Sequence, residues 1–339
     1  MYTREFDYHL PEELIAQTPI EPRDSSRLLV INRLNRSVSE HRFTDIIDYF
    51  QAGDVLVLNN TKVIAARLPA RRAGGGKAEV FLLRDLGEAR WEALVKPGNR
   101  IPVNSKLTLG RNLTVTVTAK TTEGGRIIQF RSDGEVEAAL REVGQVPLPP
   151  YIKKPISDPA RYQTVYASAA GSVAAPTAAL HFTAELLDTL QEKGVTIGYT
   201  TLHMGLGSFR PIREELLEAH RMPVEYLQVP GEVAEMVNRA KKDGRTVVAC
   251  GTDVVRTLES AARDNGKIAS FQGTTDLFIT PGYRFRVVDR FITNLHLPRS
   301  SHLVLVSAFA GRELIFEAYA YAVDKKFRFY TFGDATLML

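Results

Sequence analysis

The segment from residue 70 to residue 133 differs in residue pattern from the sequence on either side of it. It consists of short runs rich in Val, Leu, Ile, Thr and Phe, including AEVFLLR, WEALVK, KLTLG, LTVTVTA and RIIQFR. Turn signals such as GGG, DLGE, KPGN and EGG separate these runs. The alternation in LTVTVTA is typical of a strand with one solvent-exposed face. About five such strands are enough for a small antiparallel barrel or sandwich.

The flanking sequence alternates between helical and strand-like patterns. FTAELLDTLQEKG, with Thr183 as its N-cap, GEVAEMVNRAKKDG and TDVVRTLESAARDNG predict helices, whereas VTIGYTTLHMG and RTVVACG predict strands. DLFITPGYRFRVVD predicts a strand, a turn and a strand, and the apolar run 300–327 predicts two helices that divide near Gly311. Such alternation favours a sheet with helical cover. We therefore predict an α/β (mixed α+β) main domain, residues 1–67 plus 151–339, with a small antiparallel β-barrel domain, residues 68–150, inserted into it.

Composition excludes several classes of protein. The chain has 339 residues, 44% of them hydrophobic, which is enough for a sizeable core. The single cysteine, Cys250, cannot form an internal disulfide, and the seven histidines show no metal-binding spacing. No apolar run is long enough to span a membrane, and the charged N-terminal segment lacks a signal peptide's apolar core, so we expect a cytoplasmic protein. A net charge of +4 permits a polyanionic partner.

Two histidines lie among small residues in the run from residue 171 to residue 211. His181, in GSVAAPTAALHFT, comes just before a helix whose free N–H groups favour a neutral imidazole, suited to act as a base near neutral pH. A structural histidine is an equally good interpretation. His203, in TLHMGLGSFRP, precedes glycines that let a ligand approach the backbone, and Arg210 beside them could bind an anion.

Polar groups also interrupt the first apolar runs of the chain. Asn59, Asn60, Thr61 and Lys62 interrupt DVLVLNNTKV, where they form either a simple turn or a group that binds a ribose, carboxylate or phosphate. In RDSSRLLVI, Arg27 belongs either to a surface ion pair or to a loop that contacts an anion or a ribose.

Further candidates follow predicted strands later in the chain, where ligands of open α/β sheets bind. Arg256 and Glu259, in ACGTDVVRTLES after Thr252, are one helical turn apart and could simply pair with each other. ITNLHLPRSSHL contains Asn294 and His296, followed by Ser300 or Ser301 as a helix N-cap, and Asp334 could belong to a turn. From these residues alone, we predict an α/β enzyme of unknown reaction.

The order of these motifs along the chain resembles one family, the S-adenosylmethionine:tRNA ribosyltransferase-isomerases of queuosine biosynthesis. Matching segments run nearly end to end and include DYHLPEELIAQTPIEPRDSSRLLV, GDVLVLNNTKVIAARL, GQVPLPPYI, GSVAAPTAALHFT, TLHMGLGSFRPI, GTDVVRTLES, ITNLHLP and FGDA. The resemblance implies that the ribosyl part of S-adenosylmethionine is moved onto tRNA that carries 7-aminomethyl-7-deazaguanine at the wobble position. The ribosyl group is isomerised, adenine and methionine leave, and epoxyqueuosine-tRNA is formed.

The resemblance also implies roles for the candidate residues. His181 or His203 would be the base, and Glu259 or Asp334 would orient ribose hydroxyls or the amine. Residues expected to hold S-adenosylmethionine, a consumed cosubstrate, are Asn59, Asn60, Lys62, Thr252, Asn294 and His296. Arg27, Arg210 and Arg256 would meet a carboxylate or tRNA phosphates. Arg71 and Arg72 of the insert would either follow the tRNA backbone or belong to a solvated loop. We expect no metal and no membrane partner, and a monomer or a weak homo-oligomer.

Two other functions are compatible with an α/β fold. An S-adenosylmethionine-dependent methyltransferase would usually carry a glycine-rich first loop and an acidic residue after its second strand, and neither can be placed here. An inactive RNA-binding module would not need the His, Asn, Glu and Asp residues of the motifs. Free adenine as a product would distinguish the transferase from both.

Overall fold

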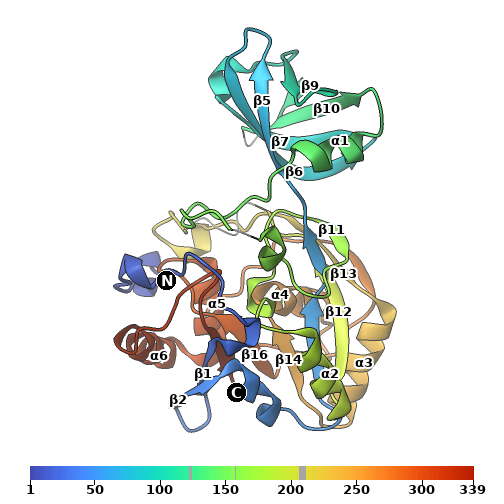
Figure 1. The fold of residues 1–339 in the computed structure, drawn as a ribbon. Helices are drawn as coiled ribbons and strands as arrows, with labels where there is room; N and C mark the ends of the chain where they lie inside the picture. Colours follow the sequence, from blue (N-terminus) through green and yellow to red (C-terminus); the bar gives the residue numbers. More distant parts are fainter. Residues whose placement is uncertain (122–123, 157, 206–210) are drawn as a thin grey trace. The chain divides into compact units, whose positions relative to one another are not determined.

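The computed structural model describes residues 1–121, 124–156, 158–205 and 211–339. The chain divides into two compact units (Figure 1). The main unit comprises Met1–Lys62, Pro150–Ala169 and Ala175–Leu339, and the barrel unit comprises Val63–Pro149 and Ala170–Ala174. No helix in the described part of the chain is long and apolar enough to cross a membrane.

The main unit is built on a nine-stranded sheet in the order β15-β13-β12-β3-β14-β16-β17-β1-β2. Its strands are β1 (Arg27–Asn32), β2 (Ser37–Arg42), β3 (Val55–Asn59), β12 (Thr196–Leu202), β13 (Glu225–Val229), β14 (Val247–Cys250), β15 (Phe271–Thr275), β16 (Arg290–Asn294) and β17 (Ala335–Met338). A separate two-stranded sheet pairs β4 (Thr61–Val63) with β11 (Ala169–Ser172).

The four central strands, β12, β3, β14 and β16, are parallel, so their carboxyl ends lie at one edge of the sheet. We call this the carboxyl edge and the opposite one the amino edge. Since β17 is antiparallel to β16, β1 is parallel to β17 and β13 is antiparallel to β12, the amino ends of β17, β1 and β13 also lie at the carboxyl edge. Strand direction alone therefore brings distant parts of the sequence together there.

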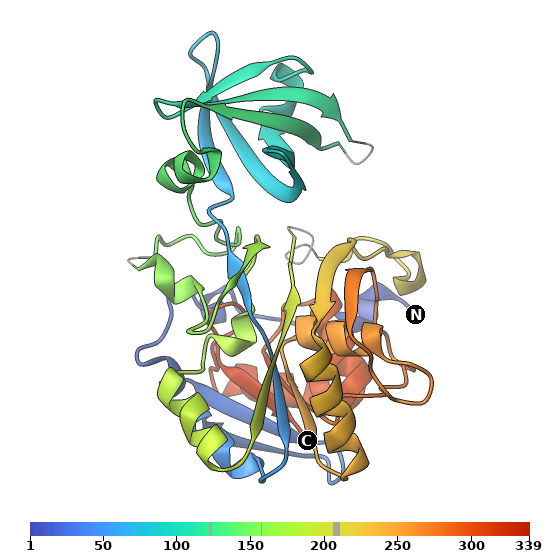
Figure 2. The same cartoon turned by 90° about the vertical axis from the view of Figure 1, so that its right-hand side faces the viewer.

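Helices cover both faces of this sheet (Figure 2). Apolar side chains of α2 (Ala184–Glu192) and of the 3-10 helices η4 (Phe43–Tyr49) and η7 (Thr177–Ala179) form one core with Leu56, Leu58, Val248 and Ile292 of the sheet. On the other face, α3 (Gly231–Lys242) and α4 (Thr252–Ala261) pack on β3, β12 and β14. The other 3-10 helices among the described residues are η1 (Thr3–Phe6), η2 (Glu12–Leu14), η3 (Arg23–Ser25), η5 (Gly98–Arg100), η6 (Pro159–Tyr162) and η9 (Leu217–Ala219).

The predicted helix ends agree with the structure. Thr183 Oγ1 accepts a hydrogen bond from the Leu186 N–H at 3.1 Å, and Ser300 Oγ does the same for Leu303 at 3.1 Å. The two apolar helices near the C-terminus, α5 (Ser301–Ala310) and α6 (Arg312–Asp324), divide at Gly311, whose φ of 89° suits glycine.

The barrel unit is a closed barrel in the order β10-β7-β6-β5-β8-β9. Its strands are β5 (Arg67–Arg72), β6 (Lys77–Gly87), β7 (Arg90–Lys96), β8 (Lys106–Leu109), β9 (Leu113–Lys120) and β10 (Arg126–Ser132). Alternate residues such as Leu68, Val80, Leu107, Val115 and Ile128 fill its interior, and α1 (Val136–Val143) packs against β5, β9 and β10. The predicted fold class, a mixed α/β main part with an inserted antiparallel barrel, is confirmed.

Two local predictions differ from the structure. Residues 276–289 do not form a strand, a turn and a strand, because the Glu259 carboxylate accepts the N–H groups of Arg286, Val287 and Val288 that a strand ladder would need. The segment FTDIIDYF is helical, as predicted, but winds as a 3-10 helix.

Candidate active site

The carboxyl edge gathers most of the predicted site residues within the main unit. Each one either ends a strand there, begins one there, or lies in the segment just before or after such a strand end. These residues are Arg27, Asn59, Asn60, His203, Thr252, Arg256, Asn294, His296 and Asp334. His181 joins them through a side-chain contact with Asn294. The sheet thus brings together residues that are as much as 307 positions apart, as in the bond from Arg27 N–H to Asp334 Oδ1.

His181 is held in a buried polar group. Its Nδ1 lies 2.7 Å from Ser26 Oγ, and its Nε2 lies 3.4 Å from Asn294 Nδ2. Asn294 Nδ2 also donates to the Tyr330 carbonyl at 2.9 Å, which fixes the orientation of the amide. Since Nε2 then faces a donor, we assign the His181 proton to Nδ1. Within the described residues, Asn294 Oδ1 is buried and has no hydrogen-bond partner.

Burial lowers the pKa of His181 to about 3, and the positive charges of Arg328, Arg161 and Arg23 add to this effect. The side chain is 5% exposed and its ring lies 4.9 Å from that of Phe43. His181 is therefore a neutral imidazole at pH 7, with both ring nitrogens already facing protein groups.

His203 occupies a more open position just beyond β12. Its Nδ1 lies 2.7 Å from Thr61 Oγ1, and its backbone N–H donates to the Tyr226 carbonyl at 3.0 Å. Its ring stacks on the Tyr226 ring, with 5.3 Å between the ring centroids. Burial lowers its pKa. Among the residues that the structure describes, none hydrogen-bonds to its Nε2. This nitrogen is available to a substrate.

Asn59 is the last residue of the central strand β3, which lies between β12 and β14. Open α/β sheets bind ligands at the carboxyl ends of strands, at the place where the chain adds later strands on both sides of an earlier one. Its Nδ2 donates to Asp253 Oδ2 and, at 3.0 Å, to the Leu202 carbonyl. Burial raises the pKa of Asp253 to about 6, although the bond from Asn59 opposes the shift. A buried carboxyl group with this pKa stands at the start of α4.

Arg256, predicted to meet an anion, already has a carboxylate partner. Its Nη1 forms a buried ion pair with Glu225 Oε2, and its Nε donates to the Leu277 carbonyl at 3.0 Å. Glu225 Oε1 also accepts the Gly205 N–H at 3.0 Å. The pairing of Arg256 with Glu259 that the helical spacing allowed does not form; Arg256 pairs with Glu225 on β13 instead.

Asp334 and Arg27 lie at the carboxyl edge but contact protein groups. Asp334 accepts the N–H groups of Arg27 at 3.0 Å and Arg328 at 2.7 Å, and burial raises its pKa. The Arg27 guanidinium pairs with Glu40 at 2.7 Å and stacks over the Phe327 ring at 3.5 Å.

Glu259 is not brought to the carboxyl edge. It lies about 10 Å along α4 from Thr252, and its oxygens accept backbone N–H groups of residues 286–288 and the Tyr283 hydroxyl at 3.3 Å. Those residues come just before β16, so Glu259 belongs to the amino edge. Its contacts are those of a carboxylate that holds a loop.

The remaining predicted residues have simpler surroundings. Asn60 Oδ1 accepts from the Thr201 hydroxyl at 2.7 Å, and Lys62 is exposed. His296 Nε2 lies 3.0 Å from Thr293 Oγ1, and burial holds the pKa of His296 well below its usual value. Thr252 is the buried first residue of α4. Arg210 lies outside the described residues. Arg71 and Arg72 belong to β5 of the barrel unit.

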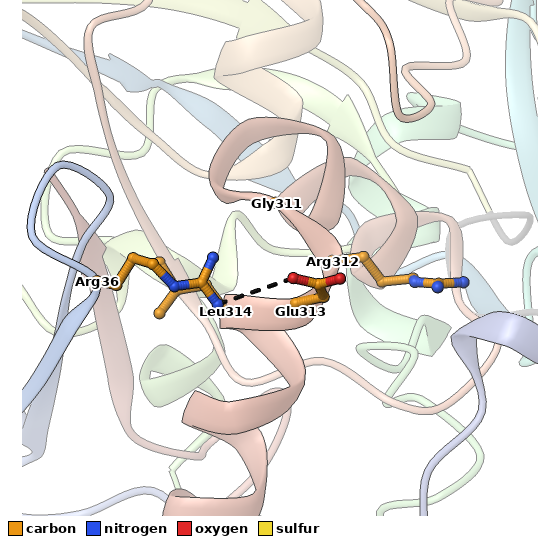
Figure 3. Close-up of a pocket in the computed structure, with 5 residues that line it drawn as sticks. All are labelled: Arg36, Gly311, Arg312, Glu313 and Leu314. Atoms are coloured by element: carbon orange, nitrogen blue, oxygen red, sulfur yellow. Dashed lines mark ion pairs between the residues drawn. The ribbon is translucent and has the colours of Figure 1, made fainter.

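A hollow of about 240 Å³ lies between the β1–β2 turn and the start of α6 (Figure 3). It is lined by Arg36, Gly311, Arg312, Glu313 and Leu314, and the Arg36 guanidinium lies 3.9 Å from the Glu313 carboxylate. The turn connects the ends of β1 and β2 at the amino edge. Since no predicted site residue lines this hollow, we do not assign it to the chemistry.

Sequence reasoning missed Glu225 and Tyr226, which begin β13. The signal was weak, because a single acid before the apolar run YLQV resembles an ordinary strand start. Asp253 and Ser26 were visible within their motifs but were not selected. Among the described residues, no three His, Cys, Asp or Glu side chains are arranged to hold a metal ion.

Comparison with known proteins identifies the family of this chain. The family model described as queuosine biosynthesis protein matches residues 3–338, almost the whole chain. The chain belongs to this family. Members with the name S-adenosylmethionine:tRNA ribosyltransferase-isomerase include one from Moorella thermoacetica, 52% identical over 342 residues, and one from Carboxydothermus hydrogenoformans, 49% identical over 339 residues. Both comparisons cover all of this chain and all of the relative.

A solved structure agrees with these relatives. The crystal structure of an S-adenosylmethionine tRNA ribosyltransferase from Thermotoga maritima is 38% identical to this queuosine-family chain, with a TM-score of 0.58. The match covers 99% of this chain and 100% of that one. The resemblance inferred from the motifs is confirmed.

Proposed function

We propose that this member of the queuosine family moves the ribosyl group of S-adenosylmethionine onto 7-aminomethyl-7-deazaguanine at the wobble position of tRNA and isomerises it. The products are epoxyqueuosine-tRNA, adenine and methionine, so S-adenosylmethionine is consumed as a ribosyl donor. Full-length identity of about half to ribosyltransferase-isomerases supports this function. The observation in the structure that carries it is the convergence of His203, Asn59 and Asn294 on the carboxyl edge. Since tRNA is the acceptor, we place the reaction in the cytoplasm.

The chemistry begins with the removal of a proton. The sulfonium acidifies the neighbouring 5′ C–H, so a neutral base must reach it. We assign this role to His203. When its Nδ1–H donates to Thr61 Oγ1, the lone pair on Nε2 is free to accept the proton. His181 is less suited, because Ser26 and Asn294 already face its two nitrogens.

Other groups at this edge would orient the substrate. Asn294 Oδ1 offers an acceptor that no described residue uses, which suits an amino or hydroxyl group of the nucleoside. Exposed Lys62, next to Asn60 and Thr61, suits the carboxylate of the methionyl end. We assign no chemical step to Glu259 or Asp334, because their oxygens already accept backbone N–H groups.

The tRNA would present a wobble base from a single-stranded loop, where it can be extruded into a pocket. The barrel unit offers a basic surface for the nucleic-acid backbone. Arg71 on β5 lies directly opposite Lys77 on β6, and both side chains are exposed. Like charges in such a pair disfavour strand pairing, and phosphates would offset their repulsion. Arg67 is less available, because it pairs with Glu79 at 2.7 Å.

Product analysis tests the function directly. The protein is incubated with S-adenosylmethionine and tRNA that carries 7-aminomethyl-7-deazaguanine, and the released small molecules are separated. We expect adenine and methionine in amounts equal to the modified tRNA. S-adenosylhomocysteine instead of adenine would indicate a methyltransferase, and tRNA binding without turnover would indicate an RNA-binding module. Either result would overturn the proposal.

A further inference from the structure

His203 lies between two backbone segments that are each tied to a buried carboxylate. Leu202 precedes it and Gly205 follows two residues later. Both carboxylates, Asp253 and Glu225, are at most 4% exposed, and neither was among the residues selected from the sequence. They come from different elements, α4 and β13 (Figure 1).

On the preceding side, the amide of Asn59 holds both backbone groups of Leu202. Its Oδ1 accepts the Leu202 N–H at 3.1 Å, and its Nδ2 donates to the Leu202 carbonyl at 3.0 Å. The same Oδ1 accepts the N–H of Thr61, whose hydroxyl meets His203 Nδ1. Asp253 accepts from Asn59 Nδ2 and so fixes this amide. One carboxylate therefore orients both Leu202 and Thr61.

On the following side, Glu225 holds the backbone directly. Its Oε1 accepts the Gly205 N–H at 3.0 Å, while its Oε2 pairs with Arg256. Arg256 is braced in turn by the Leu277 carbonyl at 3.0 Å. The side chains of the pair are 7% and 2% exposed, so water screens their charges little.

Stability is a weak reason for such an arrangement. Well-packed apolar residues often replace a buried ion pair without loss of stability, because removing the charges from water offsets their attraction. What charged groups add is fixed geometry: a charge-assisted hydrogen bond is shorter and more directional than a neutral one. A base also needs this geometry, because a misplacement of about 1 Å can slow a reaction about 100-fold.

We propose that Asp253 and Glu225 are positioning residues that hold His203 so that its Nε2 faces the substrate. The proposal rests on the assignment of His203 as the base. It gives Arg256 a role within the protein, as the partner that orients Glu225. The simpler alternative for Asp253 is an acid that stabilises the N-terminus of α4. That role would affect stability without affecting His203.

The titration of His203 separates these roles. Burial lowers the pKa of His203. The ionisable groups on the elements that surround it are Lys62 on β4, Tyr199 on β12, Tyr226 and Glu225 on β13, and Asp253, Arg256 and Glu259 on α4, of which Glu259 lies at the amino edge. Loosening either tether would admit water to the ring and raise the pKa of His203 toward its ordinary value. A change in the stability of α4 alone would leave the pKa of His203 unchanged.

The experiment compares D253A and E225Q with D54A. Asp54 is a matched control, since it is 3% exposed and accepts the N–H groups of Gln51 at 2.9 Å and Thr246 at 3.0 Å, but lies at the amino edge. kcat and KM are measured by adenine release, and the His203 titration is followed by NMR in the free enzyme. D253N, which keeps an acceptor for Asn59, serves as the conservative variant, and R256K replaces E225Q if the latter does not fold.

We expect kcat to fall about 10- to 100-fold in D253A and E225Q, with little change in KM. The pKa of His203 should rise in both, and D253N should recover most of the activity. D54A should lose stability with kcat and the His203 titration unchanged. If D253A and E225Q behave like D54A while H203A is inactive, this proposal fails alone. If H203A turns over at the wild-type rate, the assignment of the base fails with it.

Discussion

The two edges of the main sheet differ in how completely their polar side chains are paired. At the amino edge, buried or half-buried carboxylates have a partner for each oxygen. Asp54 accepts two backbone N–H groups, Asp289 accepts the Val247 N–H at 2.9 Å and Lys241 Nζ at 2.7 Å, and Glu259 accepts N–H groups of residues 286–288. These groups join loops to strand starts, and each of their oxygens already has a protein partner.

The carboxyl edge is less complete. Considering only partners among the described residues, His203 Nε2, Asn294 Oδ1 and Arg256 Nη2 lack hydrogen bonds. A buried polar atom without a partner costs about 1–3 kcal/mol, so a stable protein retains few of them without a reason. The difference supports the proposal that substrate binds at the carboxyl edge, where pairing among the described residues is incomplete.

The largest expected effect concerns the free nitrogen of His203 at the carboxyl edge. H203A removes the free Nε2, so kcat should fall about 10²- to 10⁴-fold, the usual contribution of a general base. S-adenosylmethionine binding should change little, because His203 acts on the reacting bond. Adenine release and equilibrium binding are measured separately. Wild-type turnover by H203A would show that the base is a residue other than His203.

A smaller effect is expected at the fully paired edge. E259Q weakens the hold on residues 286–288, so the free energy of unfolding should fall by about 1–3 kcal/mol. Since Glu259 lies away from His203, kcat below the melting range should remain within about twofold of wild type, a bound that corresponds to ~0.4 kcal/mol. Urea unfolding and adenine release give the two values. A large loss of kcat with unchanged stability would show that complete hydrogen bonding does not distinguish a structural edge from a catalytic one.

Buried His181 at the carboxyl edge should make stability depend on pH. The pKa of His181 is about 3 in the folded protein, below the 6.5 of an unfolded histidine. Between these values the unfolded chain binds a proton that the folded one does not, so stability falls as the pH falls. The slope from His181 alone is about 1.4 kcal/mol per pH unit. In urea unfolding, H181Q should reduce the measured slope by roughly half this amount at pH 6.5 and by nearly all of it at pH 5. An unchanged slope would contradict the burial of a neutral His181.

The smallest expected effect lies outside both edges, in the barrel unit. Arg71 has no acidic partner among the described residues, whereas Arg67 has Glu79. R71A should therefore weaken tRNA binding more than R67A does, and should reduce the slope of log affinity against log salt by about 1. Binding measured at several salt concentrations gives the slope. Equal slopes for wild type and R71A would show that Arg71 does not contact tRNA phosphates.

Much of this protein could be predicted from local sequence. Alternating patterns in residues 70–133 predicted the barrel, and the helix caps at Thr183 and Ser300 follow from residue type. Motif order identified the family. These features depend on neighbours in the chain or on a pattern that spans all of it.

The partners of the site residues were not predictable in the same way. His181 and Glu259 were both good candidates by sequence, yet α4 brings Glu259 to the amino edge and the segment before α2 brings His181 against Ser26. Likewise, Arg256 meets Glu225 across two elements and not Glu259 on its own helix. Sequence spacing limits which pairs are possible, but burial decides which pair forms, because a buried charge must find a partner from whichever element packs against it.

By itself, then, the sequence determined the fold class, the inserted barrel and the family, since periodicity, turn chemistry and motif order are properties of the chain. Only the tertiary structure decided which polar groups are paired and which remain free for a substrate. The physical reason is that hydrogen bonding in a protein interior depends on strand direction and packing between segments that lie as far as 307 residues apart.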